Sequence, residues 1–189
     1  WDAKSGEQLT IFNGHDDFVY SVGISTDGQR VVTGSRDKTA KVWDAKSGDE
    51  LLSLIAHDDL VTSVGFSPDG KWILTAGIDK KICIWDAVSG QKLNILTHND
   101  NFKNFQTQSL GLNICISPDG NRFASVSHKL LKIWDLKLGE QEPLILKAQY
   151  LKQFISYATF SPDGKRIAIG GESGNINLWD TESGVELFN

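Results

Sequence analysis

Methionine is absent from the 189 residues, and cysteine occurs only twice. A chain that keeps its initiator begins with Met, so we expect this sequence to be a piece of a longer protein. Cys83 and Cys115 lie in apolar runs with no paired spacing and no pattern of metal ligands around them. We interpret both as small core residues. This cysteine usage, together with the lack of a signal peptide, favours a reducing compartment, and we expect a cytoplasmic location.

The chain also lacks an excess of positive charge. Its net charge of -5 argues against a broad electrostatic surface for nucleic acid or an anionic membrane. Its apolar runs are short and are broken by Asp-Gly and Ser-Gly pairs, and none approaches the roughly 18 residues of a membrane span. Gly-x-Ser-x-Gly, His-Glu-x-x-His and Cys-x-x-Cys are missing as well. We therefore expect a soluble protein that is not an enzyme and uses no cofactor.

What the sequence does contain is a repeat. Trp-Asp pairs begin at positions 1, 43, 85, 134 and 179, so the spacings are 42, 42, 49 and 45 residues, close to the period of about 40 to 45 residues expected of β-propeller blades. A Ser-x-Asp-Gly sequence keeps the same phase at residues 25–28, 67–70, 117–120 and 161–164. Segments rich in β-formers flank these turns, as at residues 30–34 and 71–75. Each repeat is therefore predicted to form a small antiparallel sheet.

These markers resemble the WD-repeat family along essentially the whole chain. The family unit runs from Gly-His through a Ser-Pro-Asp-Gly turn and a turn Asp to Trp-Asp. The first repeat matches it with His15, Asp37 and Trp43, and the second repeats the pattern up to Trp85. The resemblance implies an all-β fold: a β-propeller arc of four four-stranded antiparallel blades, open or part of a larger ring. We place the repeats at approximately 7–48, 49–90, 91–139 and 140–184, with a terminal outer strand at 185–189.

In that family the start of each repeat supplies the outermost strand of the preceding blade. Residues 7–12 then look like the outer strand of a blade whose inner strands are missing, and residues 185–188 look like the outer strand of the fourth blade. In a closed four-blade ring both segments would compete for the edge beside Leu178 and Trp179. We therefore expect the chain to be cut from a longer array, whose remaining blades are expected partners.

The family also implies a hydrogen-bonded tetrad of His, Ser or Thr, Asp and Trp inside each blade. Matched by position, the first two repeats hold complete sets: His15, Thr33, Asp37 and Trp43, then His57, Thr75, Asp79 and Trp85. A His-Thr-Asp constellation can suggest proton transfer. However, the set recurs with the repeat, whereas an active site needs one assembled copy, so we interpret it as structural.

The tetrads are incomplete in the second half of the chain. The third repeat keeps His98, Ser125 and Trp134, with His128 near the place of the Asp. In the fourth repeat the four positions hold Gln149, Ile169, Ser173 and Trp179, so that only the Trp remains. We expect these two blades to be the softer pair.

Two insertions point to a binding surface. The stretch between the His position and the turn Ser measures ten residues in the first two repeats, nineteen in the third and twelve in the fourth. In the WD family this loop lies on the top rim, where many members bind partners. The longer loops carry aromatic and basic residues suited to recognition, namely Phe102, Lys103, Phe105, Tyr150, Lys152 and Phe154. A neutral surface insertion explains the extra length equally well.

The family resemblance implies a second surface around the top entrance of the channel. The matching positions are Phe18, Tyr20 and Arg36 in the first repeat, and Leu60, Thr62 and Ile78 in the second. Counting back from the turns gives Leu110, Leu112, Phe154 and Ser156 in the later repeats. Such an apolar rim is typical of an interface, although some of these side chains could instead pack within the blade edges.

Four functions therefore remain open. The leading hypothesis is a protein-interaction scaffold with its partner on the top rim. A sensor or autoinhibitory array attached to a signalling NTPase or kinase is the alternative, because residues 1–6 and 43–48 are identical, as after a recent tandem duplication. Single-stranded nucleic acid could stack on the loop aromatics, but the acidic balance makes nucleic acid an unfavoured partner. A propeller enzyme is the fourth hypothesis, since fold does not fix function.

Overall fold

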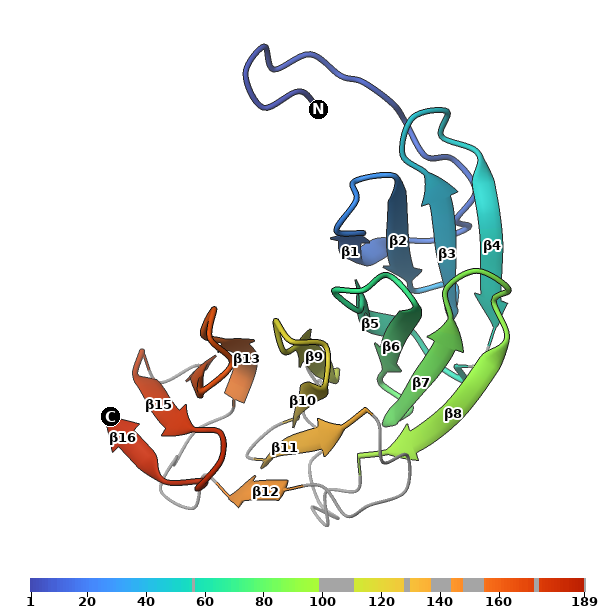
Figure 1. Ribbon diagram of the computed structural model, residues 1–189. Coiled ribbons are helices and arrows are strands. Elements are labelled where there is room, and N and C mark those ends of the chain that lie inside the picture. Colours follow the sequence, from blue (N-terminus) through green and yellow to red (C-terminus); the bar gives the residue numbers. More distant parts are fainter. Residues whose placement is uncertain are drawn as a thin grey trace.

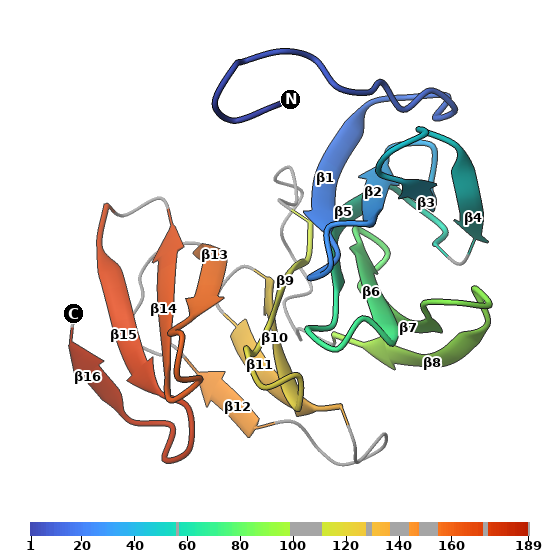
Figure 2. The same cartoon turned by 45° about the horizontal axis from the view of Figure 1, so that its top comes forward.

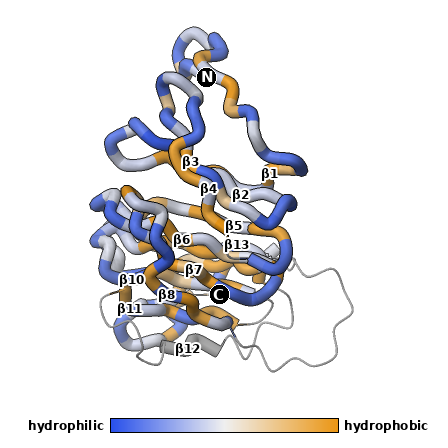
Figure 3. The backbone as a smooth tube through the Cα atoms, turned by 90° about the vertical axis from the view of Figure 1, so that its right-hand side faces the viewer, coloured by the Kyte–Doolittle hydropathy of each residue, from blue (hydrophilic) through white to orange (hydrophobic). Residues whose placement is uncertain are grey.

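The computed structural model describes residues 1–55, 57–98, 111–127, 130–136, 155–171 and 174–188, together with the backbone of 144–147. Over these residues the chain forms sixteen β-strands joined by turns. In Figure 3 hydrophobic residues follow the strands, while hydrophilic residues gather in the turns at their ends. The short apolar runs between Asp-Gly turns thus correspond to strands.

The strands form four sheets, and within each sheet they are antiparallel and follow chain order. The first sheet consists of β1 (Val19–Ile24), β2 (Arg30–Ser35), β3 (Thr39–Asp44) and β4 (Glu50–Ile55). The second consists of β5 (Val61–Phe66), β6 (Trp72–Gly77), β7 (Lys81–Asp86) and β8 (Lys92–Thr97). The third consists of β9 (Asn113–Ile116), β10 (Arg122–Ser127), β11 (Leu130–Asp135) and β12 (Leu144–Lys147). The fourth consists of β13 (Ile155–Phe160), β14 (Arg166–Gly171), β15 (Ile176–Asp180) and β16 (Glu186–Phe188).

The sheets follow one another around an open arc (Figures 1 and 2). The first strand of each sheet, β1, β5, β9 or β13, lies on the inner side of the arc, and the last strand lies on the outer side. The first and fourth sheets stand at opposite ends (Figure 1). The predicted all-β arc of four four-stranded antiparallel sheets is confirmed, and the sheets do not close into a ring.

The two predicted outer strands have different outcomes. β16 pairs with β15 through Leu178 and Phe188, as expected for the outer strand of the fourth sheet. Residues 7–12 form no strand, and the edge beside Leu178 is occupied by β16. They lie beside the first sheet instead, where the Phe12 ring packs 5.7 Å from that of Trp43, measured between centroids. A strand needs a partner for its backbone groups, and the sequence pattern alone does not supply one.

Each Ser-x-Asp-Gly sequence closes the hairpin between the first two strands of its sheet. In the first sheet the Ser25 hydroxyl donates to Asp27 at 2.6 Å and accepts from the Arg30 amide at 2.9 Å. The turn glycines adopt φ values near +70°, which glycine tolerates best: Gly28, Gly70, Gly120 and Gly164. The same bonds recur in the other three turns. All four hairpins are therefore set locally by the same short sequence.

The hydrophobic core lies between sheets. In the first of three clusters, Val32 and Val42 of the first sheet pack with Val64 and Phe66 of the second. The other two clusters join the second sheet to the third and the third to the fourth. Hydrogen bonds cross these interfaces near the inner strands, since the Val64 amide donates to Ser21 and the Ile114 amide to Ser63. Each sheet thus buries its faces by packing on its neighbours.

The contacts around Gly34 show how closely the first two sheets pack. A Cβ at Gly34 would lie 2.8 Å from a methyl carbon of Val61 and of Val64, both of them buried and stiff. Gly170 holds the equivalent place in the fourth sheet, and a Cβ there would meet nothing within 4 Å. The two glycines therefore differ in packing at the same repeat position.

Gly34→Ala is expected to lower the free energy of unfolding by about 1 to 3 kcal/mol, because the added methyl overpacks the interface between the first two sheets. Gly170→Ala is the matched control, and it should change stability little or raise it by up to about 1 kcal/mol, since a strand glycine is entropically costly. Urea unfolding followed by tryptophan fluorescence measures both. Equal effects of the two substitutions would contradict the packing described.

Candidate functional site

A repeated irregularity occurs near the start of three inner strands, β1, β5 and β13. In β1 the ladder slips between Val19 and Ser21, so that Tyr20 has no opposing residue in β2. β5 and β13 slip at the equivalent places, which leaves Thr62 and Ser156 as the extra residues. A β-bulge of this kind takes its extra residue out of the ladder and re-aims the side chain. These bulges turn one residue of each strand toward the inner side of the arc.

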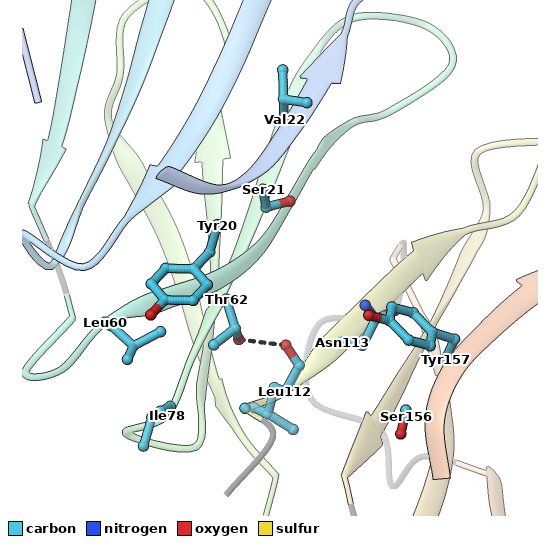
Figure 4. Close-up of a pocket in the computed structure, with 11 residues that line it drawn as sticks. Tyr20, Ser21, Val22, Leu60, Thr62, Ile78, Leu112, Asn113, Ser156 and Tyr157 are labelled. Carbon is cyan, nitrogen blue, oxygen red and sulfur yellow. Dashed lines mark hydrogen bonds between the residues drawn. The ribbon is translucent and has the colours of Figure 1, made fainter. Parts of the chain in front are cut away.

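A groove of about 560 Å³ lies where these strands converge (Figure 4). All four sheets contribute to it. It is lined by Tyr20, Ser21, Val22, Leu60, Thr62, Ile78, Gly111, Leu112, Asn113, Ser156 and Tyr157. Tyr20 and Tyr157 stand on opposite sides of the groove, with Thr62 and Leu112 between them (Figure 4).

The walls combine apolar area with a few polar groups. Tyr20 and Tyr157 are 55% and 71% exposed as whole residues, so both are available for contact with a ligand in the groove. Leu112 is buried at the base, where the Thr62 hydroxyl donates to its carbonyl at 2.6 Å and ties the second sheet to the third. The Asn113 side chain adds an amide. Rigid aromatic rings beside apolar and amide groups are suited to a polypeptide segment.

The structure brings several predicted rim residues together in this groove. Of the rim positions chosen from the sequence, six line it: Tyr20, Leu60, Thr62, Ile78, Leu112 and Ser156. Phe18 and Arg36 do not. Phe18 is 69% exposed, and Arg36 lies at the edge of the first sheet, where its Nε is 3.8 Å from an Asp17 carboxylate oxygen. The binding role of all these residues stays a prediction.

The remaining loop and rim residues lie outside the described part of the chain. They are Phe102, Lys103, Phe105, Leu110, Tyr150, Lys152 and Phe154. Their predicted role in binding therefore rests on the sequence alone.

Sequence reasoning missed five of the lining residues. They are Ser21, Val22, Gly111, Asn113 and Tyr157. A signal was present for Tyr157, because a large aromatic stands there at the position that is Ser21 in the first repeat and Ser63 in the second. An aromatic that replaces a small polar residue on an exposed strand is a candidate contact residue.

The first tetrad is a continuous chain of hydrogen bonds. The Trp43 indole N–H donates to the Thr33 hydroxyl oxygen at 2.8 Å, and that oxygen lies 2.7 Å from His15 Nε2. His15 Nδ1 lies 2.7 Å from an Asp37 carboxylate oxygen. Because a carboxylate only accepts, Nδ1 carries the proton in this contact. Asp37 also accepts from the hydroxyl and amide of Thr39 and from the Asp16 amide.

The second tetrad repeats this arrangement. Trp85 donates to Thr75 at 3.0 Å, Thr75 lies 2.8 Å from His57 Nε2, and His57 Nδ1 lies 3.0 Å from Asp79. The Asp58 amide donates to Asp79, as the Asp16 amide does to Asp37. Each network joins the loop before the inner strand to the second and third strands.

The later repeats keep less of the network. In the third sheet, Trp134 donates to Ser125 at 2.7 Å, and Ser125 lies 2.8 Å from His98, which here presents Nδ1 rather than Nε2. In the fourth sheet the Trp179 indole N–H is buried and has no hydrogen-bond partner among the described residues, since Ile169 offers no acceptor. His128, Gln149 and Ser173 lie outside the described residues.

The tetrad side chains are not placed to transform a substrate. None of the eight residues in the two complete sets lines the groove, and Thr33, Thr75 and both indole rings are buried. Partial burial acts to raise the pKa of Asp37, but hydrogen bonds from the Thr39 side chain, His15 and two backbone amides outweigh it and lower the pKa to about 2. The carboxylate is thus held ionised as a structural acceptor.

Several other polar side chains in the described part of the chain, two carboxylates and two thiols, also have structural surroundings. A second hollow, of about 500 Å³, lies at the Asp-Gly end between the third and fourth sheets. Of its carboxylates, Asp119 and Asp180 accept from backbone amides of their own turns. Burial raises the pKa of the Cys83 thiol to about 11 and that of Cys115 to about 12, so neither is a ready nucleophile.

The described residues also lack two further kinds of feature. They include no cluster of three or more His, Cys, Asp or Glu side chains that could hold a metal ion. Within the same part of the chain there is also no helix long and apolar enough to cross a membrane.

Comparison with known proteins gives two similarities. The family model described as "WD domain, G-beta repeat" matches the chain four times, over residues 6–44, 48–86, 106–135 and 145–180. A curated relative, "Periodic tryptophan protein 2 homolog" of Dictyostelium discoideum, is 39% identical over 54 residues. That alignment covers 29% of this chain and 6% of the relative, so the chain spans only a small part of the relative's length.

The contrast between the second and fourth sheets isolates the contribution of the tetrad hydrogen bond. Trp85→Phe removes an indole N–H that donates to Thr75, whereas Trp179→Phe removes an indole N–H that has no partner among the described residues. Both changes leave a similar void. We expect Trp85→Phe to cost about 1 to 3 kcal/mol more unfolding free energy than Trp179→Phe, the range for a lost buried hydrogen bond. Equal losses in chemical denaturation would show that the indole bond contributes nothing.

The Asp37 pKa predicts a dependence of stability on acid. The folded-state pKa of about 2 lies below the ordinary 3.8, so ionised Asp37 stabilises the fold fully above about pH 4. This contribution is lost as the pH falls from about 4 to about 2, and the shift corresponds to about 2 kcal/mol. Asp37→Asn should abolish that part of the slope, whereas Glu182→Gln, in an exposed turn, should keep it. Urea unfolding at a series of pH values tests this, and parallel curves for parent and Asp37→Asn would refute it.

Proposed function

Because this chain belongs to the WD-repeat family, we propose that it is a non-catalytic scaffold that holds a partner protein in the groove lined by Tyr20 and Tyr157. WD repeats generally mediate protein–protein interaction. The finer proposal, that the partner lies at this end of the inner strands, rests on the convergence of four sheets on one groove.

The observation that carries the proposal is the chemical character of that groove. Two tyrosine rings that are more than half exposed face a base containing Leu112. Exposed apolar area is normal on a protein surface, but aromatic rings gathered around a hollow are typical of an anchoring site. A partner segment that lay along the groove would contact both tyrosine side chains without rearranging the sheets.

The same geometry supports a scaffold over an enzyme. The His-Thr-Asp sets are engaged in structural bonds within the sheets, and the groove carries hydroxyl, amide and apolar groups without a carboxylate, imidazole or thiol in its lining. Such a surface can bind and orient a polypeptide, but it offers no general base or nucleophile of ordinary strength.

Substitution of the groove residues tests the proposal. Tyr20→Ala and Tyr157→Ala are each expected to weaken binding of a partner protein by at least about 1 kcal/mol, as for an interface hot spot. The melting temperature should change little, because both rings are largely exposed. The partner is first captured from cell extract with the parent chain, and its affinity for each purified variant is then measured by calorimetry.

Lys71→Ala and Lys165→Ala are the controls, since both lysines are exposed beside the Asp-Gly turns, at the opposite ends of the strands. Loss of binding in the lysine variants with full binding in the tyrosine variants would place the partner on the other end and overturn the proposal.

A further inference from the structure

One position of the inner strands has the same role at two interfaces between sheets. It lies four residues before the turn serine and holds Ser21 in β1 and Ser63 in β5. The Ser21 hydroxyl accepts from the Val64 amide at 3.1 Å, and the Ser63 hydroxyl accepts from the Ile114 amide at 3.2 Å. Each serine therefore ties its sheet to the inner strand of the next sheet.

Asn113 holds this position in the third sheet and does not repeat the contact. Its side chain forms no hydrogen bond with the Ala158 amide, the equivalent of Val64, or with any other group in the part of the chain that the structure describes. Asn113 is partly buried and lines the groove, on the side opposite Tyr20 (Figure 4). An amide that is partly withdrawn from water without a partner costs free energy. A bound group that paired with this amide would offset that cost.

The backbone around Asn113 is fixed from both sides. Before it, the Leu112 carbonyl accepts from the Thr62 hydroxyl at 2.6 Å, and after it the Ile114 amide donates to a serine of the second sheet. A Cβ at Gly111 would overlap the Thr62 side chain, so the strand lies close against that sheet. Leu112 and Ile114 are buried, and because side chains alternate along a strand, that of Asn113 points to the other face. Its amide is thus held in place before a ligand arrives, which lowers the ordering cost of binding.

The groove around this amide carries no formal charge. The described residues that line it include no carboxylate, ammonium, guanidinium or imidazole group, and Asn113 supplies their one side-chain amide. Leu60, Ile78 and Leu112 add apolar area. A charged side chain or a phosphate that entered would lose water without gaining a counter-charge, which is costly. The lining therefore favours an uncharged occupant with both apolar and amide groups.

A polypeptide main chain meets these requirements. Its peptide groups are uncharged, and each residue other than proline brings one N–H donor and one C=O acceptor that must be paired when they leave water. In an extended segment the N–H and C=O of one residue point to the same side, as they do in a hydrogen-bonded pair of antiparallel strands. A side-chain amide offers the matching C=O and N–H. One asparagine can therefore bond to both groups of a single residue.

We propose that Asn113 determines which segment the groove accepts: its amide bonds to the main-chain N–H and C=O of one residue in an extended, uncharged segment of the partner. An apolar side chain of that segment lies on Leu60, Ile78 and Leu112. This assignment rests on the proposed scaffold function and adds the chemistry of the occupant. The serines of the first two sheets are engaged between sheets, whereas the equivalent residue of the third sheet is left to contact the partner.

Overlapping peptides that cover the captured partner are the probe. Arrayed on cellulose and incubated with the parent chain, they should identify one bound segment, and calorimetry then gives the affinity of the synthetic peptide. Alanine substitution along that peptide should place its strongest contacts in a run of uncharged residues. An array without a bound segment, or strongest contacts from Lys, Arg, Asp or Glu, would overturn the proposal.

Substitution of Asn113 tests its role. Asn113→Leu keeps the approximate size of the side chain and removes its hydrogen bonds, so it should weaken binding of the peptide at least about tenfold. Asn113→Asp keeps the shape but loses the N–H donor and adds a charge, so it should weaken binding as well. Asn121→Leu is the matched control, since Asn121 is also partly buried but lies in a turn at the opposite end of the strands. Circular dichroism verifies that each variant is folded.

Methylation of the peptide main chain separates a main-chain contact from a side-chain contact. N-methylation at one residue should weaken binding to the parent at least about tenfold, because it removes the N–H that Asn113 accepts from. The same methyl group should have little effect on binding to Asn113→Leu, in which that bond is already lost. Equal effects of N-methylation on the two proteins at every position would show that Asn113 contacts no main-chain N–H, and the proposal would be wrong.

The proposed function and this inference fail in different ways. If Tyr20→Ala and Tyr157→Ala bind the peptide as tightly as the parent, the groove is not the binding site and the proposed function is wrong. If the tyrosine variants lose the peptide while Asn113→Leu keeps it, the groove is the site but Asn113 does not determine what it accepts.

Discussion

Burial of one sheet's apolar face against the next sheet is the constraint on which the rest of this structure depends. A four-stranded sheet of this length has no interior of its own, and residues such as Val32 and Phe66 leave water only where two sheets meet. This packing aligns the inner strands side by side, and the groove exists only because they are aligned. The site is therefore a property of the array and not of any single repeat.

The polar tetrads are secondary to this packing. Trp179 is buried in the fourth sheet although its network is reduced to the indole, and Ile169, which stands in place of the hydroxyl residue, joins the core cluster. An apolar substitution has thus converted a hydrogen-bonded position into a packed one. The complete networks around Thr33 and Thr75 add a link between loop and strand, whereas the Trp179 indole N–H has no partner among the described residues.

Much of the fold could be predicted because its signals are local and repeated. Asp-Gly turns and Trp-Asp pairs fix the strand positions, and the fixed offsets between His57, Asp79 and Trp85 identified side chains that hydrogen bonds join. Two features of the structure could not be predicted from the sequence, each for a physical reason. Tyr157 is paired in the ladder beside the bulge residue Ser156, and the rim positions taken from the family pattern did not include its place, so it was missed. Strand formation also depends on a partner, so the prediction that residues 7–12 are the outer strand of a further blade stays a prediction, and they form no strand in this structure.

The bulges have a consequence for how this surface can diversify. Because the extra residue takes no part in ladder pairing, its side chain is freed from the alternation of the strand. The three bulge positions already hold different side chains: Tyr20, Thr62 and Ser156. Substitutions at these positions can therefore change which partner is bound while the backbone of the fold stays the same.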